Sequence, residues 1–308
     1  MESLPLEAIL SHLTDTDRPL HNTELTELSD LSREELATFR ERFSLLPPKR
    51  RLHITNRLAE LGENNFELSF DGIFRLLLCD EDAGVRQSAI KGLWDCDDAS
   101  LIRSLINLME RDSSDEVRAA AAAALGRFAV LAEHGKLRPV YVESLRRSLL
   151  QAARDEKNPV ELRRRALEAV SPLSLAEVSE AITLAYNSGD PKFKASAVYA
   201  MGRSCDTTWL PLLYKEIKST DAELRYEAAT ALGEIGEEES VAYLIELLED
   251  PDPEVQLAAI RSLGQVGGAE ARSCLRQCLQ SDSEAVSQAA EEALEDLASG
   301  EDPLGFRI

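Results

Sequence analysis

Apolar residues recur along this chain at helical spacing, in paired segments that short polar turns separate. Residues 237–267 show the unit, with apolar positions three and four apart on either side of the turn Asp250-Pro251-Asp252-Pro253. Asp252 is suited to cap the second helix, and Pro253 to occupy its first position. Because one such pair cannot bury its apolar faces alone, each pair must stack on its neighbours.

The pair repeats at a fixed period. Apolar anchor residues that follow an acidic turn lie 31 residues apart in five segments and 32 apart in two earlier ones: Leu162, Phe193, Leu224, Val255 and Val286, and before them Val85 and Val117. A period of this length is typical of stacked repeat architectures. We therefore predict an all-α fold, an α-solenoid that winds as a right-handed superhelix of about eight stacked helix pairs.

The pattern assigns approximate bounds to both helices of each pair. First helices are predicted at residues 32–45, 66–79, 99–110, 139–154, 175–187, 208–218, 238–249 and 269–280. Second helices are predicted at residues 48–61, 83–94, 115–128, 159–170, 191–203, 222–235, 253–266 and 283–297. Ser32 and Glu35 form a capping-box signature at the start of the first pair.

Three segments depart from the repeat. Residues 1–31 are predicted to be an N-terminal arm with a short helix near its start, followed by a loosely ordered polar stretch. Residues 32–297 form the solenoid, and residues 298–308 form a tail that we expect to fold back onto the last repeat. An insertion of 14 residues, about 129–142, separates the third and fourth pairs and is either a plain connector or part of a binding face.

Composition restricts the partners and the compartment. The net charge of −22 makes nucleic acid and anionic lipid unfavourable partners, and no apolar run is long enough to suggest a membrane span. The first residues lack the features of a secretory signal, and the five cysteines show no framework spacing. We therefore expect an acidic, cytoplasmic monomer with reduced thiols.

The anchor segments carry a recognisable motif, D-x-x-V-R-x-x-A-x-x-A-L-G. It stands at residues 221–235 and recurs in residues 115–128. This motif resembles HEAT repeats, especially the short form found in phycobilin lyase subunits, and the resemblance covers about residues 32–297. It implies the solenoid fold and says little about function, because the motif residues are architectural.

A basic residue follows each of five anchors, and an Asp or Asn precedes it by three to five positions. The pairs are Arg86 with Asp82, Arg118 with Asp115, Arg163 with Asn158, Lys194 with Asp190, and Arg225 with Asp221. The resemblance implies that such pairs form a ladder between layers. The alternative is a row of phosphate-binding side chains.

Enzymes with similar repeats provide tests of catalytic chemistry. Deoxyhypusine hydroxylases hold two irons through His-Glu dipeptides, whereas none of the four histidines here is followed by Glu. Phycobilin lyase subunits hold a tetrapyrrole, but no signature here singles out residues for that role. We therefore predict no catalytic residues, no metal site and no cofactor.

The best candidates for partner binding lie on the second helices, which usually line the concave face of a solenoid. Positions two, six and ten after each anchor share one exposed stripe of the helix. Tyr and Arg, which are enriched at interface hot spots, gather on it at Tyr199, Arg203, Tyr226 and Arg261, and further arginines stand at Arg127 and Arg164. In the alternative interpretation, Tyr packs over a neighbouring helix and Arg pairs with Glu234 or Glu168.

Charge is also uneven along the chain. Residues 136–165 hold nine Lys or Arg against four acids, and residues 237–308 hold four against seventeen. The basic segment is either a solvated patch or a docking site for an acidic partner segment.

The sequence therefore predicts a non-catalytic scaffold that binds a protein or peptide along its concave face. The alternative is a subunit of a phycobilin-lyase-like or other HEAT-repeat enzyme.

Overall fold

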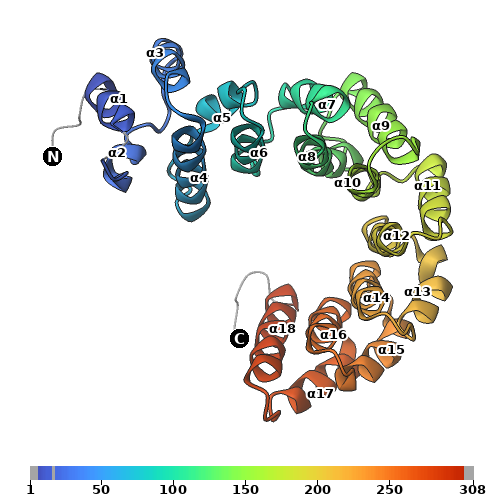
Figure 1. Cartoon of the computed structure of the whole chain (residues 1–308). Helices are drawn as coiled ribbons and strands as arrows, with labels where there is room; N and C mark the ends of the chain where they lie inside the picture. Colours follow the sequence, from blue (N-terminus) through green and yellow to red (C-terminus); the bar gives the residue numbers. More distant parts are fainter. Residues whose placement is uncertain (1–5, 16–17, 302–308) are drawn as a thin grey trace. The chain divides into compact units, whose positions relative to one another are not determined.

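The computed structural model describes residues 6–15 and 18–301, and these residues form helices and turns with no strand (Figure 1). The predicted all-α solenoid class is confirmed, since helices α3 to α18 follow one another as the eight expected pairs. The chain divides into two compact units. Unit 1 comprises residues 1–131 and 135–148, and unit 2 comprises residues 132–134 and 149–308.

Unit 1 holds two N-terminal helices and three helix pairs. Their bounds are α1 (Leu6–Thr14), α2 (Asn22–Thr26), α3 (Arg33–Ser44), α4 (Pro48–Asn64), α5 (Asp71–Leu77), α6 (Ala83–Gly92), α7 (Leu101–Arg111) and α8 (Asp115–Glu133). The last two residues of α8 belong to unit 2, and α9 (Pro139–Arg154) is divided between the units after Ser148.

Unit 2 continues the alternation of first and second helices. Its helices are α10 (Val160–Val170), α11 (Ala176–Tyr186), α12 (Pro191–Arg203), α13 (Leu210–Glu216), α14 (Ala222–Ile235), α15 (Val241–Glu246), α16 (Pro253–Val266), α17 (Gly268–Cys278) and α18 (Glu284–Glu301). Short 3-10 turns precede α13 and flank α15. The second helices α10, α12, α14, α16 and α18 pack against one another in that order (Figure 1).

Small residues bring these second helices together. A Cβ atom on Gly202 of α12 would lie only 2.5 Å from Cα of Ala231 on α14. A Cβ atom on Gly233 would likewise lie 2.6 Å from Oγ of Ser262 on α16, and one on Gly264 would lie 2.9 Å from Cβ of Ala293 on α18. Each glycine stands nine residues after its anchor, and each small partner stands seven after the next anchor. This register fixes the spacing between neighbouring layers.

Ion pairs join the start of four second helices, α4, α6, α12 and α14, to the next layer. Arg225 of α14 donates to both carboxylate oxygens of Asp250 at 2.7 and 2.8 Å, and Arg86 of α6 binds Asp112 at 2.8 and 2.6 Å in the same way. Asp250 also accepts from the backbone nitrogen of Asp252, so it fixes the turn before α16. The hydrogen bonds from Arg225 hold the pKa of Asp250 below its ordinary value despite burial.

Ion pairs between layers are therefore present, but most of the predicted acidic partners are wrong. Of the predicted pairs, Arg118–Asp115 is present as an ion pair at 3.0 Å, within α8. Asp82, Asp190 and Asp221 cap their own helices instead, each accepting a bond from a backbone nitrogen of the first turn. The acidic partners lie at or just after the end of the next first helix, in the pairs Arg51–Asp80, Arg86–Asp112, Lys194–Glu216 and Arg225–Asp250.

The segments outside the regular repeat contain further helices. The polar stretch expected to be loosely ordered contains α2, whose Glu24 binds His12 at 2.9 Å and Arg18 at 2.7 Å. The predicted capping box of Ser32 and Glu35 is confirmed. The insertion lengthens α8 and α9, and the boundary between the two units passes through these helices. Helix α18 runs to Glu301, and the predicted fold-back of the tail falls on residues 302–308, outside the described residues.

A substitution where two second helices meet, as at Gly202, should separate the effect of packing on stability from the effect of helix propensity. Gly202→Ala should lower the free energy of unfolding by about 1–3 kcal/mol, because the added methyl group meets the backbone of α14. The control is Gly62→Ala in the interior of α4, where a Cβ meets only the Phe70 ring at 3.7 Å, so helix propensity should raise stability. Chemical denaturation of the full chain measures both. If Gly202→Ala raised the free energy of unfolding, the approach of α12 to α14 would not depend on a glycine at this position.

Candidate functional site on the second helices of unit 2

Polar side chains gather on three neighbouring second helices of unit 2, in the middle of the predicted stripe. We call this group the α10–α14 cluster: Arg164 and Glu168 on α10, Ser196, Tyr199 and Arg203 on α12, and Glu227 and Glu234 on α14. The close packing of these helices brings the side chains within interaction distance. The cluster has three carboxyl groups and two guanidinium groups.

A buried serine joins α10 to α12. Arg164 Nε donates to Ser196 Oγ at 2.8 Å, and Ser196 Oγ donates to Glu168 Oε1 at 2.6 Å. The other oxygen of Glu168 accepts from Arg165 at 2.8 Å. Because Ser196 is 1% exposed and fully bonded, it is a structural link that a substrate cannot reach.

A second link joins α12 to α14. Arg203 forms an ion pair with Glu234 at 3.1 Å, and this pair lies within electrostatic reach of Tyr199. Burial raises the pKa of the Tyr199 hydroxyl, the positive charge of Arg203 opposes the shift, and the nearby glutamates reinforce it. Burial also raises the pKa of Glu234, although Arg203 compensates in part. These residues form a partly desolvated polar surface.

Glu227 is the carboxyl group that the cluster stabilises least. Burial raises its pKa from the ordinary value of 4.5 to about 7, and repulsion from Glu168 and Glu223 adds to the shift. The charge of Arg164 opposes the shift but does not cancel it. The charge of Glu227, when this group is ionised, is therefore only partly compensated by Arg164.

The structure brings together three of the six predicted site residues. Arg164, Tyr199 and Arg203 all belong to the α10–α14 cluster, and the predicted alternative of an Arg203–Glu234 pair is present. Tyr226 is half-buried on α14 and adjoins Glu227 in sequence. These positions are compatible with the predicted site and do not test it.

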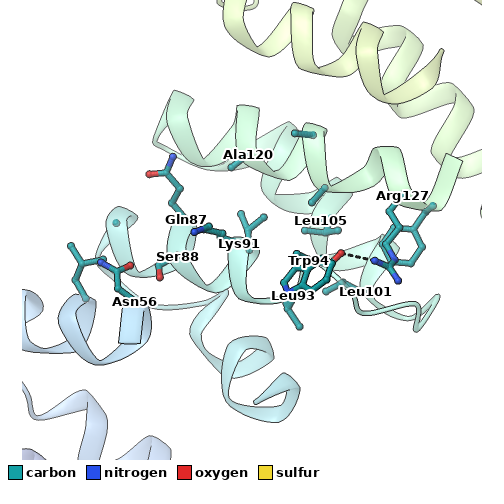
Figure 2. Close-up of a pocket in the computed structure, with 16 residues that line it drawn as sticks. Asn56, Gln87, Ser88, Lys91, Leu93, Trp94, Leu101, Leu105, Ala120 and Arg127 are labelled. Atoms are coloured by element: carbon teal, nitrogen blue, oxygen red, sulfur yellow. Dashed lines mark hydrogen bonds between the residues drawn. The ribbon is translucent and has the colours of Figure 1, made fainter. Parts of the chain in front are cut away.

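The other two predicted residues lie elsewhere. Arg261 is exposed on α16, where it lines a hollow against α18 together with Gln265 and Glu292. Arg127 belongs to unit 1, where it bonds Asp97 and the carbonyl oxygen of Trp94 at the edge of a pocket (Figure 2).

Sequence reasoning missed Glu227 and Ser196, which stand three residues after their anchors. At this position most repeats have a small residue, namely Ser88, Ala120, Ser196, Ala258 and Ala289. An acid at Glu227 was therefore a signal that could have been read. Arg165, the other charged residue at this position, is paired with Glu161 and Glu168.

The arginines of the basic segment largely bind within the chain. Arg163 lies over the Phe193 ring at 4.6 Å, Arg164 binds Glu161, and Arg154 donates to the carbonyl oxygen of Glu177. These contacts support the interpretation of a solvated, internally paired patch. Within the described ranges, no group of three or more His, Cys, Asp or Glu is placed to hold a metal, and no helix is long and apolar enough to cross a membrane.

The family model for HEAT repeats matches residues 70–148, 174–251 and 210–295. The chain belongs to the HEAT-repeat family. HEAT repeats suggest an interaction scaffold, and the family match alone specifies no partner or binding face. A search of curated proteins finds no significant match.

Two solved structures share the fold at low sequence identity, and a third aligns more weakly. The CpcE–CpcF complex of phycocyanin lyase from Nostoc sp. PCC7120 aligns with a TM-score of 0.53 at 17% identity, over 96% of each chain. Kap95p, in a structure with RanGDP, aligns with a TM-score of 0.51 at 14% identity, and the match covers 96% of this chain but 46% of Kap95p. Human deoxyhypusine hydroxylase reaches a TM-score of 0.37 at 17% identity, over 95% and 96% of the two chains. These likenesses concern the fold alone.

The raised pKa of Glu227 predicts a pH-dependent stability. The pKa of Glu227 in the folded state lies above its value in the unfolded state. Its contribution to the free energy of unfolding is therefore fully present below about pH 4.5 and is lost as the pH rises through about 7. Glu227→Gln should therefore raise the melting temperature at pH 8 and change it little at pH 5. The matched control is Glu239→Gln, at an exposed position, which should change neither value. An equal shift at both pH values would contradict the assignment to Glu227.

Proposed function

We propose that this chain is a non-catalytic scaffold that binds a basic segment of a protein or peptide on the second-helix face of α10, α12 and α14. The observation that carries the proposal is the Glu227 carboxyl group, which is partly desolvated and has three glutamates among the charges that act on it. A Lys or Arg side chain from a partner would neutralise this carboxylate. Binding would thereby relieve an electrostatic cost that the free chain bears.

The surroundings of Glu227 support a protein partner. Tyr199 and Tyr226 are half-buried on α12 and α14, and such aromatic side chains offer rigid contact area with a polar tip. The net charge of −22 attracts basic segments over a longer range and repels nucleic acid. Family membership supports the general role of a scaffold.

The enzyme alternative receives no specific support. The likeness to phycocyanin lyase concerns the fold, and no residue of the α10–α14 cluster favours lyase chemistry over binding. The Ser196 hydroxyl and the Arg203–Glu234 pair are occupied within the cluster.

Selection of a random peptide library on the immobilised full chain at pH 8 tests the proposal. The selected peptides should be enriched in Lys or Arg. The affinity of a synthetic peptide from the selection should rise between pH 6 and pH 8, by up to about fivefold for one partly exposed ion pair. The sign follows from ionisation of Glu227, whose pKa is raised to about 7. Titration calorimetry measures this change.

Variants separate the site from general attraction between opposite charges. Glu227→Gln should abolish the pH dependence and weaken binding at pH 8, whereas Glu239→Gln removes the same charge at an exposed position and should preserve both. Tyr226→Ala should weaken binding without changing the pH dependence. If Glu227→Gln and Glu239→Gln weaken binding equally, attraction to the net charge explains the affinity and the proposed site is wrong.

A further inference from the structure

Unit 1 contains a pocket of about 670 Å³ between the second helices α6 and α8 (Figure 2). Its volume lies within the range of small-molecule sites in proteins. The lining is mainly apolar, with Leu93, Leu101, Leu105 and Phe128 alongside three alanines of α8. Neither the family nor the scaffold role proposed above accounts for this space.

The pocket exists because one layer contact of the repeat is missing. On α12, α14 and α16 of unit 2, a glycine nine residues after the anchor meets a small residue of the next second helix, as Gly202 meets Ala231. In α6 the residue at this register is Trp94, and the helix already ends at Gly92. The corresponding small residue of α8, Ala124, lines the pocket together with Trp94. The register that closes the layers of unit 2 thus leaves an opening here.

The pocket extends beneath the second helices. Leu101 and Leu105 come from the first helix α7 and are 2% and 1% exposed, yet both line the pocket. At the mouth, the Trp94 side chain is 47% exposed, which is unusual for so large an apolar group. A deep apolar floor with an aromatic wall favours insertion of a compact molecule over contact with a flat protein surface.

One buried polar group in the wall has no partner. The Ser88 hydroxyl lies on α6, the residue is 7% exposed, and its oxygen forms no hydrogen bond in the structure. Its counterpart at the same register in unit 2, Ser196, makes two side-chain hydrogen bonds. Figure 2 shows Ser88 along the pocket between Asn56 and Lys91. Because an unsatisfied buried hydroxyl is unfavourable, a ligand that bonds Ser88 gains an interaction that the free chain lacks.

The charges at the rim are already compensated. Lys91 forms an ion pair with Glu63 at 3.2 Å, and Arg127 is held by Asp97 and by the carbonyl oxygen of Trp94. An anionic ligand would therefore have to displace existing pairs, and a cationic ligand would meet two like charges. The pocket is matched to a neutral molecule.

We propose that this pocket binds a neutral small molecule with a flat aromatic or aliphatic body and one hydrogen-bonding group. The body lies against Trp94 and above Leu105, and the polar group bonds Ser88. The proposal concerns unit 1 and is independent of the peptide site proposed on unit 2.

N-phenyl-1-naphthylamine is a suitable probe, because it is neutral, carries one N–H group and fluoresces in apolar surroundings. Titrated into the full chain, it should show saturable fluorescence with one site and should quench Trp94 emission. Ala124→Leu should weaken binding by about tenfold or more, because the added side chain occupies the pocket. The matched control is Ala242→Leu at an exposed position of α15, which should bind as the natural chain does.

Two further variants keep the test decisive if Ala124→Leu does not fold. Ser88→Ala should weaken binding and also raise the melting temperature of the free chain, since it removes an unpaired buried hydroxyl. Trp94→Ala should weaken binding by removal of the aromatic wall. The proposal would be overturned if the natural chain showed no saturable binding. It would also be overturned if all three variants bound the probe as tightly as the natural chain does. Binding of a neutral Leu/Gln amphipathic helical peptide but not of the probe would make the pocket a protein-docking groove and would also overturn it.

Discussion

The close approach of neighbouring second helices is the constraint on which the rest of this structure depends. Where a glycine such as Gly202 faces a small residue such as Ala231, the helix backbones meet with no room for a Cβ atom. Dispersion contacts across so short a distance stabilise each layer, and the distance also decides which side chains can meet. Because the helices lie this close, Ser196 can form hydrogen bonds with two residues of α10, and the charge of Glu168 can raise the pKa of Glu227.

On α14, a buried Arg–Asp fork complements the glycine contact at the opposite end of the helix. The Arg stands one residue after its anchor, near the start of the helix, whereas the glycine stands nine after it. A fork such as Arg225–Asp250 is bidentate and also fixes the following turn through the nitrogen of Asp252. Helices α12 and α14 are thus held at both ends.

The helices could be predicted because their signals are local. Pro253 marks a helix start from within a few residues, and the anchors repeat at a constant period. The acidic partners of the forks could not be predicted in this way. Asp82 caps its own helix, and Arg86 instead binds Asp112, which lies 26 residues further along the chain. The unusual acid at Glu227 could be read from the sequence, but its raised pKa could not. Its environment is set by the neighbouring helix, and a one-dimensional pattern does not contain the register between helices.

The tryptophan at the mouth of the unit 1 pocket has a consequence for how such proteins can diversify. In the genetic code the glycine codon GGG and the tryptophan codon TGG differ by one base. At a close contact such as Gly202, the same exchange would clash with the next helix, because no Cβ atom fits there. In α6 the helix ends at Gly92, before Trp94, and the Arg86–Asp112 fork is present at its start. A repeat can thus contain a cavity where its second helix ends early, while its fork stays in place.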